Sequence, residues 1–306
     1  MRIKVSFIIV IIMLLTNCRK VEKLQFIEYP DFKLGFTTQN FIGSIPVTSK
    51  NVIKLIDYAS SNGFCWIELR DPDATLTLDE CKQIANHAKE KKIEIAYAIQ
   101  SGLLNEDFWD VFMRGVNNAA LFNDNGPCTL RTSACGEEFS LDLNKKGWTQ
   151  EELFRIITNA NKAAQIASEK GVQLVLENGI EAVFSKDSLY FGIEDLFLQI
   201  NTIDLQFDTA NPFSVSRVHS DPSKVKEFLQ TNCYRLAYIH LKSSHDGHAQ
   251  PFLTANPLPF SDIFEILHNY GINYIAVELS TVFNENEVYQ NHDKSILFLK
   301  EKGFIF

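Results

Sequence analysis

The sequence predicts an α/β protein built as one (β/α)8 barrel of the TIM type, a single domain preceded by an N-terminal signal segment. From Lys33 to the C-terminus, short apolar runs alternate with longer amphipathic segments, which is typical of parallel βα units. No linker rich in Gly or Ser and no low-complexity run divides this stretch. Because about 250 residues suffice for one closed barrel, we expect one domain over residues 33–306.

Composition and charge exclude several classes of protein. The chain has 306 residues, of which 45% are hydrophobic and 22% charged, so it is neither disordered, nor collagen-like, nor a coiled coil as a whole. Its formal net charge is −9. An acidic balance of this size argues against a protein that grips nucleic acid through phosphate contacts. We therefore expect no nucleic-acid partner.

The N-terminal segment has the layout of a secretory signal. Arg2 and Lys4 precede an uncharged apolar run over residues 5–15, which is too short to span a bilayer comfortably. The run ends in Leu-Thr-Asn-Cys, which resembles a bacterial lipobox in which Cys18 is lipidated and becomes the mature N-terminus. We predict a lipoprotein signal peptide over residues 1–17 and a tether over residues 18–32. A plain signal peptide with an incidental Cys and an uncleaved anchor are the alternatives.

The residues after Cys18 bear on where the protein would be anchored. Arg19, Lys20 and Lys23 follow it, and the acidic run that directs some lipoproteins to the cell surface is absent. We therefore expect an exported bacterial lipoprotein with a periplasm-facing membrane anchor.

Five further cysteines cannot all pair, since their number is odd, and no two of them form a CxxC motif. We expect most to be buried apolar residues, although Cys128 and Cys135 could oxidise in an exported protein.

Eight short apolar runs are the expected strands. They cover residues 34–37, 66–70, 94–99, 129–132, 173–177, 205–208, 236–240 and 275–278. Eight parallel strands without a linker favour a closed barrel over an open, doubly wound sheet.

The segments between the runs predict helices with recognisable ends. Thr77 with Glu80 three positions later marks the start of a helix over residues 79–91, and Thr149 with Glu152 starts one that continues to Lys170. Apolar spacing and terminal Gly residues predict further helices over residues 49–60, 258–270 and 287–302. The helix expected over residues 107–123 is the weakest, because Gly115 and an Asn-rich end interrupt it.

Polar residues gather at the ends of the predicted strands, where the active site of a parallel barrel lies. Four consecutive strands end in Glu177, Asp208, His240 and Glu278. Taken singly, a strand-terminal carboxylate is often a helix cap or salt-bridge partner, and a lone His is often a core residue. Together, the four form an oxygen and nitrogen site suited to one divalent ion such as Mn2+, Mg2+, Co2+ or Zn2+.

The same arrangement suggests a reaction. A metal between Glu177 and Glu278 would hold a substrate carbonyl and its neighbouring hydroxyl, and would stabilise an enediolate. One carboxylate could remove a proton from carbon while the other returns it, on the same or the adjacent carbon. That reaction isomerises or epimerises a sugar.

Other polar residues have less certain assignments in the sequence. Glu68 and Arg70 end the second strand and form either a structural pair or a substrate contact. His245 and His248 follow the seventh strand as further ligands, as substrate contacts or as parts of a solvated loop. The remaining histidines are expected at the surface: His87, His219, His268 and His292. A Gly-rich phosphate loop, an HExxH motif and a nucleophile elbow are all missing from the sequence.

The strand endings Leu-Glu-Asn, Phe-Asp-Thr-Ala-Asn, Ile-His-Leu-Lys and Val-Glu-Leu resemble those of the sugar phosphate isomerase/epimerase family, a group of xylose-isomerase-like TIM barrels. The resemblance runs from about Lys33 to the C-terminus. It implies that Glu177, Asp208, His240 and Glu278 bind the metal, and that the two glutamates transfer the proton. The chain departs from the family at Gly179, after the strand-five Glu-Asn, and at Asn211, where many epimerases have His.

We take a group of five residues as candidate substrate contacts: Glu68, Arg131, Asn211, Lys242 and His248. The leading hypothesis is a metal-dependent isomerase or epimerase acting on a free sugar or sugar derivative. A second is a lyase or hydratase acting on a 3-keto-glycoside or related keto sugar with the same metal and carboxylate pair. A third is a lipid-tethered sugar-binding protein on a catalytically degenerate barrel. A homo-oligomer is compatible with all three.

Overall fold

The computed structural model describes residues 32–135, 147–179, 190–214 and 220–304. Eight parallel strands close into a barrel in the order β1-β10-β7-β6-β5-β4-β3-β2. The predicted (β/α)8 barrel is therefore confirmed. The barrel strands are β1 Lys33–Thr37, β2 Trp66–Arg70, β3 Glu94–Gly102, β4 Thr129–Ser133, β5 Gln173–Glu177, β6 Asp204–Asp208, β7 Leu236–Leu241 and β10 Tyr274–Val277.

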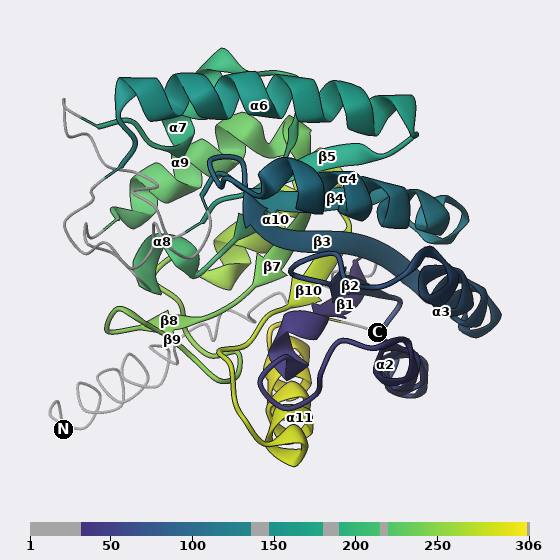
Figure 1. Cartoon of the computed structure of the whole chain (residues 1–306). Helices are drawn as coiled ribbons and strands as arrows, with labels where there is room; N and C mark the ends of the chain where they lie inside the picture. The colour runs from purple at the N-terminus through teal and green to yellow at the C-terminus, as the bar shows by residue number, and fades with distance from the viewer. Residues whose placement is uncertain (1–31, 136–146, 180–189, 215–219, 305–306) are drawn as a thin grey trace, which may run out of the picture.

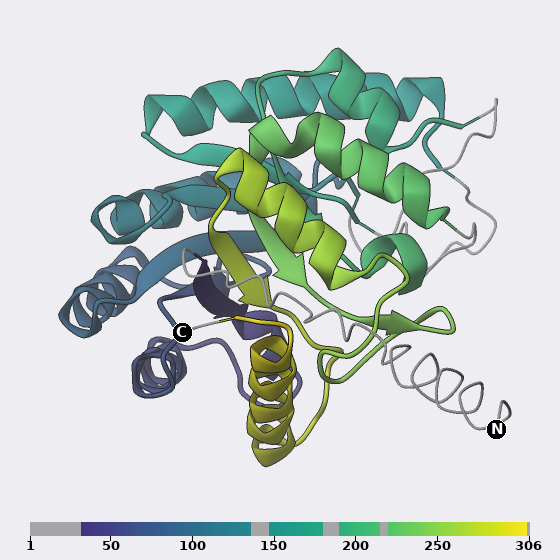
Figure 2. The same ribbon diagram turned by 180° about the vertical axis from the view of Figure 1, so that it is seen from behind.

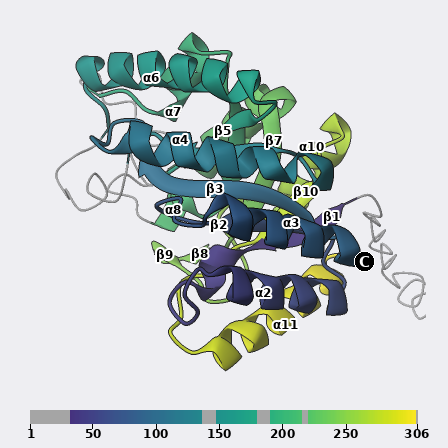
Figure 3. The ribbon, with the colours of Figure 1, turned by 45° about the vertical axis from the view of Figure 1, so that its right-hand side comes forward.

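Helices cover the outside of the barrel. Figure 3 shows α2, α3, α4 and α6 following one another on one side, and Figure 2 brings α9 and α10 forward on the other. The α-helices are α2 Ser49–Ser61, α3 Leu78–Lys91, α4 Phe108–Ala119, α6 Gln150–Glu169, α7 Ile193–Gln199, α8 Asn211–Ser214, α9 Pro222–Asn232, α10 Phe260–Tyr270 and α11 Glu285–Glu301. The described residues also form the 3-10 helices η1 Thr38–Phe41, η2 Ala120–Asn125 and η3 Cys233–Arg235.

A small hairpin follows β7 at the carboxyl end of the barrel. Its strands are β8 Ser244–His245 and β9 His248–Ala249. The hairpin contacts α8, and Figure 1 shows the two lying together on one side of the molecule.

The predicted helix starts are confirmed by their caps. Thr77 and Glu80 form a reciprocal capping box at the start of α3, and Thr149 and Glu152 form one at the start of α6. At the other end, Gly271 adopts a φ of 70° after α10, a conformation that Gly reaches at little cost.

The prediction that Gly115 interrupts a helix is wrong. α4 runs through this residue and ends at Ala119, where the 3-10 helix η2 begins. A Cβ at Gly115 would lie 2.9 Å from Cγ2 of Ile99 on β3. The glycine therefore lets α4 pack closely on the barrel, and the helix tolerates its low propensity.

The barrel interior is built in layers, because side chains two residues apart on a strand face the same way. An inner cluster consists of Trp66, Ala96, Val175, Tyr238 and Ala276. Two residues further along four of the same strands come four polar residues: Glu68, Glu177, His240 and Glu278. An apolar layer thus lies directly below a charged one at the carboxyl ends of the strands.

The described cysteines, at positions 65, 81, 128, 135 and 233, form no disulfide with one another, so no bond joins Cys128 to Cys135 in this structure. The predicted signal peptide, with Cys18 and the tether up to residue 31, lies outside the described residues. Across the described part of the chain, every helix is either too short or too polar to cross a membrane.

Candidate active site

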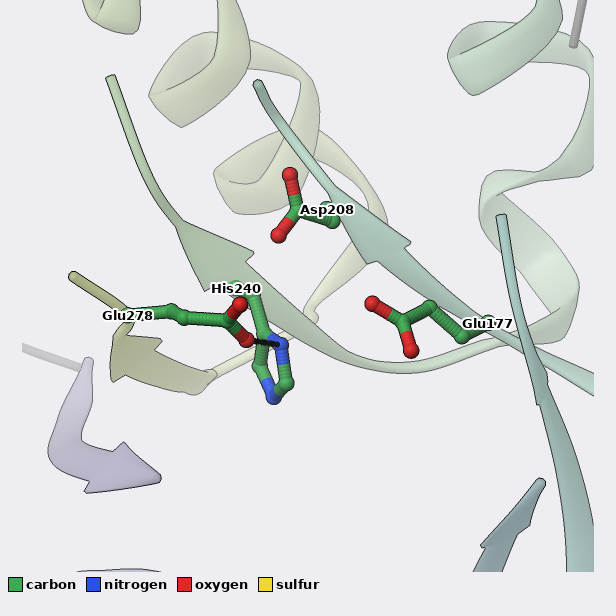
Figure 4. A group of neighbouring side chains, drawn as sticks. All are labelled: Glu177, Asp208, His240 and Glu278. Carbon is green, nitrogen blue, oxygen red and sulfur yellow. Dashed lines mark ion pairs between the residues drawn. The ribbon is translucent and has the colours of Figure 1, made fainter. Parts of the chain in front are cut away.

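The structure brings the four strand-end residues together. Glu177, Asp208, His240 and Glu278 are all buried, and each offers one ligand atom to a group whose members lie within 4.8 Å of one another. Figure 4 shows their side chains converging from separate strands. Three of them end or lie within β5, β6 and β7, while Glu278 comes one residue after β10.

His240 is held by a carboxylate on each side. Its Nε2 lies 3.1 Å from Oε2 of Glu68, and its Nδ1 lies 2.6 Å from Oε2 of Glu278. Burial lowers the pKa of His240, but the charges of Glu68 and Glu278 outweigh this effect and raise the pKa to about 10. The imidazole is therefore cationic here, with Nδ1 directed at the group of four.

Glu68 is a fully buried anion beneath His240. Its Oε1 accepts a hydrogen bond from Thr37 at 2.8 Å, and its Oε2 accepts one from the Tyr238 hydroxyl at 2.7 Å. Burial alone raises the pKa of Glu68, yet the charges of His240 and Arg131 hold it well below its usual range. This carboxylate fixes the ring of His240, as carboxylates behind metal-binding histidines commonly do.

Asp208 has one oxygen committed and one free. Oδ1 accepts hydrogen bonds from the backbone N–H groups of Ala210 at 2.7 Å and Asn211 at 2.8 Å. Oδ2 makes no hydrogen bond and lies 3.7 Å from Nζ of Lys242. Burial raises the pKa of Asp208 to about 6, with Lys242 opposing and Glu278 adding to the rise.

Glu177 lies between Arg131 and Asn211. Arg131 donates from Nη1 to Oε2 of Glu177, and its Nε lies 3.4 Å from Oε2 of Glu68. Asn211 donates from Nδ2 to Oε1 of Glu177 at 3.2 Å. Burial lowers the pKa of Arg131, but Glu177 and Glu68 raise it above its ordinary value, so the guanidinium stays charged.

Glu278 is positioned by its backbone and by a lysine. Nζ of Lys242 donates to its Oε1 at 2.6 Å. Although burial lowers the pKa of Lys242, Glu278 and Asp208 raise it above the usual value, so the ammonium is charged. Asn40 of η1 bonds to both neighbours of Glu278, donating to the Val277 carbonyl at 3.0 Å and accepting from the Leu279 N–H at 2.9 Å.

The donor set fits a divalent cation. Three buried atoms face the site: Oδ2 of Asp208, which makes no hydrogen bond, and Nδ1 of His240 with Oε2 of Glu278, which lie 2.6 Å apart as an ion pair. Because Nε2 of His240 is bonded to Glu68, Nδ1 is the nitrogen left for a metal. Carboxylate oxygens with one imidazole suit Mn2+, Mg2+, Co2+ or Zn2+. The expected metal site therefore has the atoms it needs.

The candidate substrate contacts fall into three groups. Arg131, Asn211 and Lys242 bond directly to the two glutamates of the site. Glu68 is fully buried and bonds to Thr37, Tyr238 and His240, so in this structure it positions the His240 ring. His248 is exposed on β9, and among the described residues no hydrogen bond or ion pair of its side chain joins it to the site.

Two expectations about neighbouring residues need correction. Glu68 and Arg70 do not form an ion pair with each other, since Glu68 faces His240, Tyr238 and Arg131 instead. His292 is buried and not at the surface; Asn40 Nδ2 lies 2.9 Å from its Nε2. His87 is partly buried beside Asp57, His268 is exposed as expected, and His219 lies outside the described residues.

Sequence reasoning missed Asn40 and misplaced His292. η1 is too short for any periodic pattern, so nothing singled out Asn40. His292 shares the buried face of α11 with Val288, Ser295 and Leu299. That helical spacing was the signal that could have placed it inside.

Comparison with known proteins places the chain. The family model described as "Xylose isomerase-like TIM barrel" matches residues 56–302. The chain belongs to this family. A search of curated protein sequences finds no match.

Solved structures share the fold at low sequence identity. A xylose isomerase-like TIM barrel protein from Mycobacterium smegmatis, in complex with magnesium, has a TM-score of 0.65 and 14% identity, over 90% of this chain and 99% of that one. D-psicose 3-epimerase with D-tagatose from Clostridium cellulolyticum H10 gives 0.64 and 13%, over 89% and 100%. The probable 3-DHS dehydratase from Bacillus anthracis gives 0.60 and 15%, over 88% and 98%.

Proposed function

We propose that this protein is a metal-dependent sugar isomerase or epimerase that moves a proton between carbon and a carboxylate. One observation carries the proposal: Glu177 and Glu278 come from β5 and from the end of β10, yet face the same point as Asp208 and His240. A metal could polarise a carbonyl, and two carboxylates beside it could accept and return the proton of the neighbouring carbon. The family membership and the similarity to a sugar epimerase support it.

The chain's own residues divide the work. Arg131 and Asn211 each donate to Glu177, which fixes the carboxylate that takes a proton from carbon. Lys242 donates to Glu278, which returns a proton from the opposite side. A divalent ion held by Glu177, Asp208, His240 and Glu278 would polarise the substrate carbonyl and make the neighbouring C–H bond acidic. The intermediate in this scheme is an enediolate.

Elimination is the alternative outcome of the same first step. A proton removed beside a carbonyl can be followed by loss of a hydroxyl or glycosidic oxygen, which would make the protein a lyase or hydratase on a 3-keto-glycoside or related keto sugar. The similarity to a probable dehydratase supports keeping this candidate. A catalytically degenerate sugar-binding protein would carry out neither reaction.

Exchange of solvent deuterium tests the proposal. The full-length chain, loaded in turn with Mn2+, Mg2+, Co2+ or Zn2+, is mixed with keto sugars and 3-keto-glycosides in D2O and followed by NMR. We expect deuterium to enter at the carbon beside the carbonyl, with epimerised or isomerised product.

Variants assign the roles. Glu177→Gln and Glu278→Gln should each reduce exchange by at least about 100-fold, which is within the range that a general base contributes. Glu265→Gln, on the exposed face of α10, is the matched control and should keep full activity. Full exchange by both site variants contradicts the roles assigned here, and metal binding without exchange by the wild type favours the sugar-binding hypothesis.

A further inference from the structure

Two arginines lie in register on strands β2 and β4, with one residue of β3 between them. Arg70 on β2 pairs in register with Ala98 on β3, and Ala98 pairs with Arg131 on β4. Only a methyl group therefore separates the two arginines along the sheet. Arg70 faces the interior because Glu68, two residues before it, does so.

These arginines carry donors that the protein does not use. Nη2 of Arg131 is buried and makes no hydrogen bond, and the same holds for Nε of Arg70. The described residues give the Arg70 side chain neither a hydrogen bond nor an ion pair. Burial and the nearby charge of Arg131 lower the pKa of Arg70, whereas Glu177, Glu278 and Glu68 raise it. The Arg70 guanidinium is thus close enough to the carboxylates of the site to interact with their charges, and no described residue is bonded to it.

The balance of charge points in the same direction. Glu68, Glu177, Asp208 and Glu278 are four carboxylates, facing the permanently charged side chains of Arg70, Arg131 and Lys242. Among the described residues, the cationic His240 brings the sum of these charges to zero in the metal-free site. A divalent ion that takes the place of the proton on Nδ1 of His240 would leave a surplus of one positive charge. A buried site with such a surplus favours a ligand that brings one negative charge.

We propose that the substrate is a keto sugar carrying a carboxylate, which binds to the unused donors of Arg70 and Arg131. This proposal rests on the function proposed above and names the substrate class of the same site. A planar carboxylate matches the fork of a guanidinium. Its single charge also equals the surplus, whereas a phosphate ester brings between one and two charges at neutral pH.

Binding of matched sugars tests the proposal. D-fructose is the neutral probe, and 2-keto-D-gluconate and D-fructuronate differ from it only by oxidation of one terminal carbon to a carboxylate. D-fructose 6-phosphate is the phosphate probe. Titration calorimetry on the full-length, metal-loaded chain at low salt should show at least one acid binding about tenfold or more tightly than D-fructose and D-fructose 6-phosphate. Raising the salt concentration should reduce the difference in affinity between the preferred acid and D-fructose.

The variant Arg70→Gln should bring the affinity for the preferred acid to within about twofold of that for D-fructose. Because none of the described residues forms a hydrogen bond or ion pair with the Arg70 side chain, we expect this variant to fold and to bind metal as the wild type does. Arg70→Lys keeps the charge without the fork and should retain part of the preference. Arg155→Gln, on the exposed face of α6, is the matched control and should behave as the wild type.

The proposal is overturned if both acids and D-fructose bind equally, if Arg70→Gln keeps the preference, or if D-fructose 6-phosphate binds most tightly. Its failure is distinguishable from that of the proposed function, because binding and deuterium exchange are separate measurements. If neutral sugars exchange deuterium and neither acid binds more tightly than D-fructose, only the proposed substrate class is contradicted. If the wild type prefers an acid, Arg70→Gln loses this preference and no sugar exchanges deuterium, only the proposed catalytic function is contradicted.

Discussion

Glu68 shows how a single buried charge can organise a candidate metal site without belonging to the group of possible ligands. It is fully buried, and its Oε2 joins Nε2 of His240 and the Tyr238 hydroxyl. With this carboxylate behind it, the imidazole presents Nδ1 to the other three ligand candidates. Glu68 therefore acts through His240 and is a positioning residue.

Replacing Glu68 with Gln should weaken metal binding. The variant keeps the size of the side chain but removes the negative charge that orients the ring, and losses of this kind typically cost about 10–100-fold in metal affinity. Competition of the full-length chain with a fluorescent chelator measures the change. Glu265→Gln serves as the control, and an unchanged metal affinity in Glu68→Gln would remove Glu68 from this role.

His292 is a second buried residue whose protonation matters. Burial lowers its pKa from 6.5 to about 3, so the folded protein keeps it neutral. Its Nε2 can then accept from Nδ2 of Asn40 at 2.9 Å. In the unfolded chain the same ring takes up a proton near its ordinary pKa. The folding free energy tied to His292 is therefore fully present above pH 6.5 and is lost as the pH falls from 6.5 toward 3.

We expect the free energy of unfolding to fall more steeply with acid in the wild type than in His292→Gln. The difference in slope should approach about 1.4 kcal/mol per pH unit between pH 6 and 4. Denaturant titrations at a series of pH values measure it, and carboxylates that titrate in both proteins cancel in the difference. His268→Gln on the exposed face of α10 should keep the wild-type slope. Parallel pH profiles for wild type and His292→Gln would show that His292 is not protected in this way.

The sequence predicts those residues of the candidate site that lie at the carboxyl ends of strands. Glu177, Asp208 and His240 terminate apolar runs, and the carboxyl ends of barrel strands meet at one place. Partners that come from loops or helices follow no such rule. Asn40 is invisible in the sequence because its role depends on the backbone at positions 277 and 279.

At the scale of elements, β10 ends one residue before Glu278, the residue that it positions in the site. Val277 is its last residue, so the strand ladder does not extend over Glu278. The N–H of Glu278 still donates to the Leu241 carbonyl at 2.9 Å, and Asn40 of η1 bonds to the residue on either side. η1 and α11 thus act together through Asn40 and His292 to fix the carboxyl end of β10.

Asn40→Ala should destabilise the protein and displace Glu278. The change removes two bonds to the backbone around Glu278 and leaves buried groups unpaired, so we expect a loss of about 2–4 kcal/mol. Deuterium exchange should fall as well, even at temperatures where the variant is fully folded. Thermal denaturation and exchange measured on the same sample separate the two effects. Asn51→Ala is the control, since the side chain of Asn51 is only partly buried and bonds locally to the Pro46 carbonyl. Equal behaviour of the two variants would refute a special role for Asn40.

Element boundaries were predictable where local chemistry sets them. The two capping boxes at Thr77 and Thr149 define helix starts from four residues each. At Gly115 local chemistry gives the wrong prediction, because a contact between two elements decides the structure there. The local propensity of this glycine argues against a helix, but the contact with Ile99 that requires it joins two elements and is absent from the local sequence.

At the scale of the whole molecule, the alternation of inward and outward side chains along each strand places polar residues from several strands in one candidate site. The same register that closes an apolar layer around Trp66 and Tyr238 sets the charged layer directly above it. For this reason the alternating segments of the sequence predict both the barrel and the strand ends at which the candidate site lies. The pairing of charges within that layer depends on side-chain reach across the barrel, which alternation does not specify.

The N-terminal segment determines where this barrel would work. We propose that the chain is exported and anchored through a lipid on Cys18, because a short apolar run after Arg2 and Lys4 ends in Leu-Thr-Asn-Cys. Export would also suit an unphosphorylated substrate, in agreement with the carboxylate proposed for Arg70 and Arg131.

Metabolic labelling in a bacterial host tests the anchor. The full-length chain should incorporate labelled palmitate and sediment with membranes, whereas Cys18→Ser should lose the label. Cys65→Ser, which alters an exposed thiol of the barrel, should keep it. The lipobox predicts that the lipid is attached through Cys18 and through no other residue. Label that persists in Cys18→Ser would therefore contradict the anchor. A wild type that binds membranes without taking up label would favour an uncleaved apolar segment instead.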